Sequence, residues 1–155
     1  LVERIAQHPL NRALRVDKMT LAALRATLAI YEHGRHFEEV PLLRFLSTPS
    51  DVIEQRSQRL AEQLRAALAA WNVEVVEDEA FVGGGATPEQ ALPSWSIALS
   101  SSRYRVEDFA RNLRLGDPAV VPRVKRDRLI LSLHAVSPED DEKLVESVIP
   151  AAANT

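Results

Sequence analysis

The feature that most constrains the fold of this chain is a change of hydrophobic period at Asn72. Before it, apolar residues recur at steps of three and four, the spacing of one face of an α-helix. After it, "VEVVED" alternates with a period of two and is rich in β-branched residues, which is typical of a half-buried strand. We therefore expect helices first and a sheet afterwards.

Two long helices are predicted before the change of period. The first runs from about Thr20 to His33, with Asp17 or Thr20 as its N-cap and Gly34 after its end. Its apolar stripe consists of Leu21, Leu24, Leu28 and Tyr31. A short helix or turn follows at "VPLLRFLST".

The second long helix is predicted from Pro49 to about Trp71. Thr48 is its candidate N-cap, Pro49 takes the first helical position, and Asp51 follows Thr48 at the spacing of a capping box. Its apolar stripe consists of Ile53, Leu60, Leu64, Ala67, Leu68 and Trp71.

The rest of the chain is predicted to form a loop, a strand, a helix, a hairpin and a last helix. The loop is "FVGGGATPEQALPSW", the second strand "SWSIALS", and the helix "VEDFARNLRLGD", which ends at Gly116. "AVVPRVKRDRLILSLHAV" indicates a hairpin with its turn near Arg126 and Asp127, and the last helix follows cap residues Ser137 and Asp140. We expect the tail "PAAANT" to fray.

This order predicts an α/β chain of the α+β type, with a small, mostly antiparallel sheet and helices on one face. We expect residues 1–48 to be a helical segment leading into the domain, residues 49–150 the domain, and residues 151–155 a tail. The chain begins at Leu1, and "LVERIAQ" has the pattern of a helix already under way, so we expect a piece of a longer protein.

Composition narrows the classes of function. The formal net charge of −3 argues against a non-specific nucleic-acid binder, although a local basic patch is compatible with it. The absence of cysteine excludes a disulfide scaffold, a thiolate zinc site and a cysteine nucleophile. No apolar run approaches the ~20 residues of a membrane span and no secretory signal is visible, so we expect a cytoplasmic protein.

Positive charge collects where the first long helix begins. Arg12 and Arg15 are three residues apart, so in a helical turn they point the same way. Two guanidinium groups can bind phosphate or carboxylate oxygens bidentately, and free N–H groups at a helix start would add to the attraction. The same pattern is also typical of a solvated basic turn.

Three other features could carry chemistry. The glycines at 83–85 permit close backbone approach to a phosphate, but a sharp connection between strands is the better interpretation, because Pro88 and a strand follow. His33 and His36 have the spacing of a metal pair without a third ligand, so we predict no metal site. Basic residues outnumber acidic ones over 103–128, which indicates a solvated face or, alternatively, an RNA-contacting one.

Four blocks resemble one family. "HPLNRALRVDKMTLAALRATLAIY" is closely similar to a segment of the bacterial selenocysteine synthases, the L-seryl-tRNA(Sec) selenium transferases. "PLLRFLSTP", "VGGGATPEQALPSW" and "RDRLILSLHAV" resemble later blocks of that family in the same order, so the resemblance covers about Leu1 to Ile149. It implies the C-terminal small domain of a fold-type-I, aminotransferase-like enzyme that uses pyridoxal phosphate (PLP).

The resemblance also implies the site residues. Two arginines of the family's "RALR" block help to bind the anionic selenium donor, selenophosphate, and the matching residues are Arg12 and Arg15. The family converts seryl-tRNA(Sec) to selenocysteinyl-tRNA(Sec). Its PLP lysine belongs to an upstream motif that this chain lacks, so we expect no catalytic residue here, and Lys18 does not take that role. Lys18 and Arg123 are expected as secondary anion or RNA contacts, and the parent enzyme as a dimer or higher oligomer.

The chain departs from the family pattern in two places. Ser132 and His134 stand where the family has aspartate and arginine, and Pro122 stands where glycine is common before the retained Arg123. Two alternatives therefore stay open. One is a related PLP-dependent lyase acting on a small hydroxy-amino acid, and the other is a non-catalytic oligomerisation or RNA-contact module.

Overall fold

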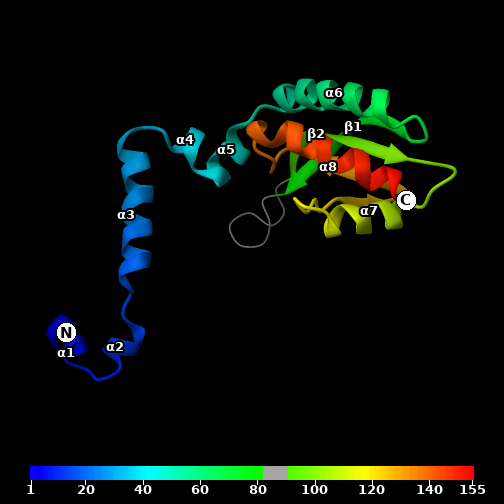
Figure 1. Ribbon diagram of the computed structural model, residues 1–155. Helices are drawn as coiled ribbons and strands as arrows, with labels where there is room; N and C mark the ends of the chain where they lie inside the picture. Colours follow the sequence, from blue (N-terminus) through cyan, green and yellow to red (C-terminus); the bar gives the residue numbers. More distant parts are fainter. Residues whose placement is uncertain (82–90) are drawn as a thin grey trace. The chain divides into compact units, whose positions relative to one another are not determined.

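The computed structural model describes residues 1–81 and 91–155 (Figure 1). These fall into two compact parts, an N-terminal segment of residues 1–44 and a C-terminal domain of residues 45–155. Among the described residues, no helix is both long enough and apolar enough to cross a membrane. The prediction for the glycines at 83–85 lies outside the described residues.

Helices make up the N-terminal segment. They are α1 (Val2–Ala6), α2 (Asn11–Leu14), α3 (Lys18–Glu32), α4 (His36–Glu39) and α5 (Pro41–Ser47), whose last residues belong to the C-terminal domain. The predicted first long helix is confirmed as α3, and its N-cap is Asp17, whose carboxylate accepts hydrogen bonds from the N–H of Met19 and of Thr20. Gly34 follows the helix with a φ of +72°, the left-handed conformation that glycine adopts most readily.

The apolar stripe of α3 is exposed, and no described residue of the N-terminal segment buries it. Leu21 and Leu24 are each 53% exposed, Leu28 is 57% exposed, and no residue of α1 to α5 is buried in the part of the chain described. An amphipathic helix gains most of its stability from packing its apolar face. The N-terminal segment therefore has an apolar face without a core beneath it.

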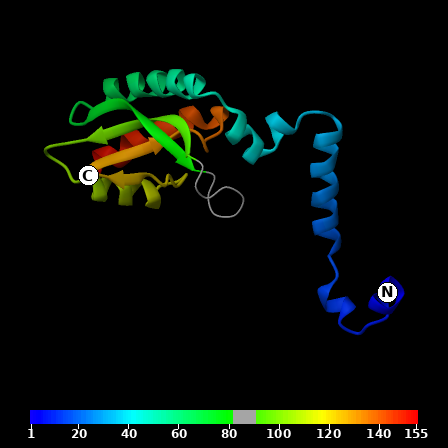
Figure 2. The same ribbon diagram turned by 180° about the vertical axis from the view of Figure 1, so that it is seen from behind.

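The C-terminal domain contains a four-stranded sheet and three longer helices. In chain order the elements are α6 (Ser50–Ala67), β1 (Asn72–Phe81), β2 (Ala91–Ser100), α7 (Val106–Leu115), β3 (Arg123–Lys125), β4 (Arg128–Ser132), the 3₁₀ helix η1 (Pro138–Asp140) and α8 (Asp141–Ala153). The strand order is β1-β2-β4-β3, and every pair of neighbours is antiparallel (Figures 1 and 2). The predicted α+β fold with a mostly antiparallel sheet is confirmed.

The three helices α6, α7 and α8 pack on one face of the sheet, as predicted (Figures 1 and 2). The inward side chains of neighbouring strands lie in register, with Val73 opposite Leu99 on β2, and Leu99 opposite Leu129 on β4. Phe109 of α7 is fully buried among them, as are Leu64 of α6 and Val148 of α8. Because side chains alternate along a strand, the opposite face carries the polar residues described below.

The start of α6 differs from the sequence prediction. The helix begins at Ser50, and Pro49 is its N-cap residue in an extended conformation, with φ −64° and ψ 147° and no side-chain capping bond. The N-cap therefore lies at Pro49, one residue after the predicted Thr48, and Pro49 does not take the first helical position. The helix ends at Ala67 rather than near Trp71, because Leu68 leaves the helical conformation with φ −111° and ψ 62°.

The second strand begins earlier than the sequence indicates. Residues Ala91–Pro93, predicted as loop, belong to β2, and Pro93 pairs with Glu79 on β1. On its other side β2 pairs with β4 only between Ser96 and Leu99. Proline has no N–H to donate, so it fits the stretch of β2 that has a neighbouring strand on one side only.

The turn and the tail of the domain test two further predictions. The hairpin turn at Arg126 and Asp127 is confirmed, and both residues have left-handed φ values, 52° and 55°, as in the tight turns that match strand twist. The prediction that "PAAANT" frays is wrong: α8 continues to Ala153, and Ala152 is buried. The Asn112 side-chain amide donates to the Asn154 carbonyl at 3.1 Å, which fastens the end of the chain to α7.

Candidate anion-binding site

Arg12 and Arg15 lie around the short helix α2. Arg12 is in its last turn, and Arg15 is its C-cap residue with an extended backbone, φ −67° and ψ 143°. The Asn11 side chain donates to the Ala6 carbonyl at 3.2 Å, which ties the start of α2 to the end of α1. Both arginines are exposed, and neither guanidinium group has an ion pair or hydrogen bond among residues 1–81 and 91–155. Both are therefore available to an external anion.

The sequence predicts that the N–H groups at the start of α3 help the arginines to bind an anion, but these groups have another partner. At the beginning of α3, Asp17 accepts the N–H of Met19 at 2.7 Å, the N–H of Thr20 at 3.0 Å and the Thr20 hydroxyl at 2.8 Å. The hydrogen bonds from Thr20 and Met19 hold the pKa of Asp17 below its usual value. An anion at this helix start would meet a carboxylate, so the prediction of free N–H groups here is wrong and the candidate site depends on the guanidinium groups.

The two secondary candidates have different surroundings. Lys18 is the first residue of α3 and is exposed, without an ion pair in the described structure. Arg123 of β3 forms an ion pair with Asp78 of β1 across the open face of the sheet, and the Ser96 hydroxyl donates to the same carboxylate at 2.6 Å. Arg123 already has a carboxylate partner, whereas Lys18 has none.

Asp78 is held ionised by this network. Burial raises its pKa, but the hydrogen bonds from the Ser96 hydroxyl and the Glu79 N–H and the charge of Arg123 outweigh burial and lower it. The three side chains come from both outer strands and from β2 between them. The network therefore acts as a polar cross-link over the open face of the sheet.

The histidines noted for their metal-pair spacing have other contacts. The His33 Nδ1 atom lies 2.5 Å from the Ala29 carbonyl. The His36 ring stacks on Tyr31 at a centroid distance of 5.0 Å and also contacts Phe37 at 4.5 Å. In the described parts of the chain no three histidine, aspartate or glutamate side chains gather closely enough to hold a metal ion.

His134, which stands where the family has arginine, lies in the interior of the C-terminal domain. The ring is buried, packs against Phe45 at 4.6 Å, and shares a hydrogen bond between Nδ1 and the Ser94 hydroxyl at 2.8 Å. Burial lowers the pKa of His134, although a hydrogen bond with the Phe45 backbone opposes this. Sequence patterns could not reveal these partners, because Phe45 and Ser94 are far from His134 along the chain.

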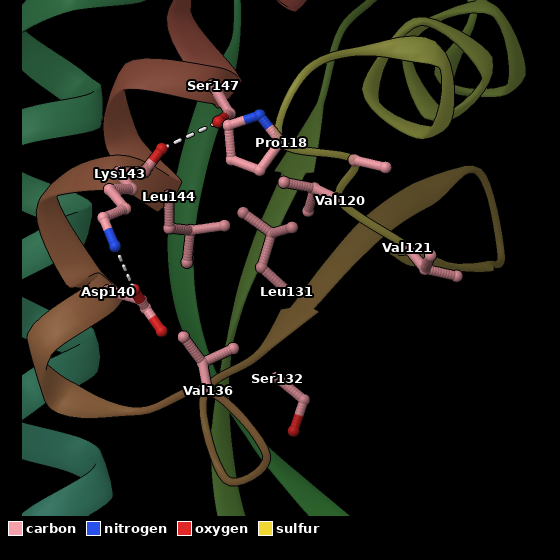
Figure 3. Close-up of a pocket in the computed structure, with 11 residues that line it drawn as sticks. Pro118, Val120, Val121, Leu131, Ser132, Val136, Asp140, Lys143, Leu144 and Ser147 are labelled. Carbon is pink, nitrogen blue, oxygen red and sulfur yellow. Dashed lines mark hydrogen bonds and ion pairs between the residues drawn. The ribbon is translucent and has the colours of Figure 1, made fainter.

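The domain also has a pocket of about 360 Å³ between α8, β4 and the connection that precedes β3 (Figure 3). Its floor is apolar and includes Val120, Leu131 and Leu144. At its rim Lys143 pairs with Asp140 at 2.7 Å, and this contact raises the pKa of Lys143. The lysine's charge is balanced there, so this pocket lacks the unpaired cation that an anion site needs.

The fold and the arginine pair define an α+β domain preceded by a helical segment that carries the candidate anion site. The family model described as L-seryl-tRNA selenium transferase matches residues 1–137, so the chain belongs to that family. The resemblance stated from the sequence blocks is confirmed.

Named relatives support the same conclusion. The L-seryl-tRNA(Sec) selenium transferase of Aquifex aeolicus is 36% identical over 140 residues, which is 90% of this chain and 30% of the relative. The proteins of the same name from Carboxydothermus hydrogenoformans and Desulfotalea psychrophila are each 37% identical, over 139 and 144 residues, 90% and 92% of this chain and 30% of each relative. The chain thus spans about 30% of the length of the relatives it matches.

Proposed function

We propose that this chain is part of a PLP-dependent transferase that converts L-seryl-tRNA(Sec) to selenocysteinyl-tRNA(Sec) with selenophosphate, and that Arg12 and Arg15 bind the donor. The observation that carries the proposal is the pair of exposed guanidinium groups without protein partners in the described structure. They lie within the region matched by the family model. The C-terminal domain takes the place of the small domain of a fold-type-I enzyme.

In this proposal the arginines bind and orient the donor. A guanidinium group presents planar N–H donors that match two oxygens of a phosphate-like anion, and it stays charged across the physiological pH range. Two such groups would neutralise the negative charge of selenophosphate and hold it in one orientation. Lys18 is a secondary contact, because an ammonium group is a point charge without that geometry.

The residues of this chain do not by themselves fit a PLP site. A lysine that forms a Schiff base is activated by a lowered pKa or an enclosed pocket. Lys18, Lys125 and Lys143 are exposed, and Asp140 raises the pKa of Lys143. We therefore assign PLP and its lysine to another part of the parent enzyme. Borohydride reduction of this chain with PLP should label no single lysine stoichiometrically, and such labelling would contradict the assignment.

We also propose that the parent enzyme is a cytoplasmic dimer or higher oligomer. The exposed apolar stripe of α3 supports an interface with another chain, because contiguous exposed apolar surfaces mark contact sites. The tRNA in the names of the relatives supports the location. A monomer by light scattering at micromolar concentration would contradict the oligomer.

The dependence of the rate on donor concentration tests the proposed role of the arginines. In the full-length enzyme, Arg12→Lys and Arg15→Lys should need about tenfold more selenophosphate for half-maximal rate, because each loses a bidentate contact. Arg25→Lys, on the exposed surface of α3, is the matched control and should leave this concentration unchanged. An unchanged requirement for selenophosphate in all three variants would contradict donor binding by the pair.

A further inference from the structure

A second collection of positive charge lies at one end of the C-terminal domain. Three connections meet there: residues 69–72 between α6 and β1, residues 100–105 after β2, and the turn 125–128 between β3 and β4. Figures 1 and 2 show the first two at the same end of the sheet. They and the turn line a shallow cavity of about 660 Å³. We call this surface the basic end.

The charge of the basic end differs from that of the whole chain, which is −3. Its cationic residues are Arg103, Arg105, Lys125, Arg126 and Arg128. The carboxylate in the same three connections is Asp127. This segregation concentrates a positive potential at one end of an acidic protein, which is the usual electrostatic mark of a polyanion-binding surface.

Part of this charge is not compensated within the structure. Arg105 lies 3.7 Å from Glu107, and Arg128 lies 3.2 Å from Glu74. Arg103, Lys125 and Arg126 have no side-chain ion pair or hydrogen bond among the residues described. Three unpaired cations on neighbouring connections repel one another unless an external anion lies between them.

Hydrogen bonds hold together the first two connections of the basic end. The Ser101 hydroxyl donates to the Ala70 carbonyl at 2.9 Å and accepts the N–H of Arg103 at 3.1 Å and of Tyr104 at 3.3 Å. The Tyr104 ring stacks on the buried Trp71 at a centroid distance of 6.0 Å. The first two connections are therefore fastened to each other, and a ligand would not have to order them.

We infer that the basic end binds the sugar–phosphate backbone of an RNA. Arginine and lysine side chains with serine hydroxyls are the groups that contact phosphate oxygens, and such contacts position a nucleic acid without reading its sequence. Ser100 and Ser102 line the cavity beside Arg126 and supply the hydroxyls. Binding to a lipid surface adds exposed apolar side chains to such cations, whereas the residues that line this cavity are small, polar or charged apart from the buried Trp71.

The identity of the RNA rests on the proposed function, which makes it the tRNA(Sec) substrate. The binding itself does not depend on selenium transfer. Contacts at the basic end would hold the body of the tRNA through its backbone, so the expected binding is weakly sequence-dependent and strongly salt-dependent.

Fluorescence anisotropy with the 155-residue chain and a labelled tRNA(Sec) transcript tests the inference. The variant Arg103→Gln/Lys125→Gln/Arg126→Asn removes the three unpaired cations, and asparagine tolerates the left-handed turn position. Binding at low salt should weaken about ten- to hundredfold, and the slope of log K against log salt should fall by about two. The control Arg4→Gln/Arg25→Gln/Arg111→Gln makes the same change of charge on exposed residues elsewhere and should bind within about threefold of the parent chain.

Four outcomes would overturn the inference. They are no tRNA binding by the parent chain at low salt, tRNA binding by the basic-end variant as tight as that of the parent, an equal loss in both variants, or tighter binding to phosphatidylserine vesicles or polyglutamate than to tRNA. Circular dichroism must show that both variants keep the parent's fold. The proposed function fails and this inference stands if the full-length enzyme lacks selenium transfer while the basic-end variant still loses tRNA binding. Only the inference fails if transfer is present and the basic-end variant binds tRNA normally.

Discussion

The helices α3 and α6 have similar patterns and opposite surroundings. Leu60 of α6 is 1% exposed beneath the sheet, whereas Leu24 of α3 is 53% exposed. An apolar stripe at helical spacing shows that a helix face is suited to packing, but it does not show which part of the protein or which other molecule packs on that face. The difference teaches that the C-terminal domain contains its own core, whereas the described residues of the N-terminal segment form an amphipathic helix without a core of their own.

Two sets of arginines, one in each part, also differ in their surroundings. In the domain, Arg56 is 10% exposed and its Nε donates to Asp141 at 2.8 Å. In the segment, Arg12 and Arg15 are exposed and have no partner among the described residues. We expect substitutions of buried, paired charges such as Arg56 and Asp141 to change stability, and substitutions of the exposed, unpaired Arg12 and Arg15 to change binding.

The largest expected difference concerns ion pairs. Asp141→Asn leaves Arg56 buried without its carboxylate and should reduce the free energy of unfolding by about 3–5 kcal/mol. Glu39→Gln removes the exposed pair with Arg35 in the segment and should cost about 0.5 kcal/mol or less. Urea denaturation of both variants checks this, and similar costs for the two would contradict the contrast.

Packing should give the next largest difference. Leu60→Ala opens a cavity in the core and should cost about 2–5 kcal/mol, whereas Leu24→Ala removes an exposed side chain and should cost about 0.5 kcal/mol or less. Both tryptophans, Trp71 and Trp95, are in the domain, so their emission follows its unfolding alone. A large loss of domain stability in Leu24→Ala would show that α3 is part of the same core.

The smallest effect is expected at the start of α3. Asp17→Ala removes the cap and should speed amide exchange in the first turn about fivefold, with no change in the domain. Because the folded state lowers the pKa of Asp17, its contribution is complete above the usual value of about 3.9 and is lost as the pH falls through the lowered value. Exchange measured by NMR between about pH 2 and 6 checks the direction. Acid-induced fraying of α3 in Asp17→Ala as large as in the parent chain would contradict the assignment.

Sequence patterns predicted most elements of the fold, because local signals were strong. The period of two after Asn72, the cap at Asp17 and the turn at Arg126 each depend on a few neighbouring residues. The errors came from tertiary structure. The residues around Pro93 do not show that β4 pairs with β2 only from Ser96 onward, which leaves Pro93 free to join the strand. The residues of "PAAANT" do not show that the Asn112 side chain will donate a hydrogen bond to Asn154.

The candidate site was predictable only in part. The spacing of Arg12 and Arg15 pointed to an anion, and the resemblance supplied the donor, which remains a prediction. The pairing of Arg123 with Asp78 could not be foreseen, because the two side chains meet across a sheet whose strand order the sequence does not state. The cations of the basic end all lie in the basic stretch 103–128 that the sequence singled out, but the three connections that form this surface come together only after folding.

The measurement that tests the central claim most directly combines selenium transfer with stability in the same full-length variants. Arg12→Ala and Arg15→Ala should each lower selenocysteinyl-tRNA formation about ten- to hundredfold, the effect of losing one charge-assisted contact of about 1.5–3 kcal/mol. Their urea midpoints and the absorbance of bound PLP should equal those of the parent enzyme and of the control Arg25→Ala. Transfer within about twofold of the parent in both variants would contradict the account. A change that small corresponds to less free energy than the loss of one charged hydrogen bond.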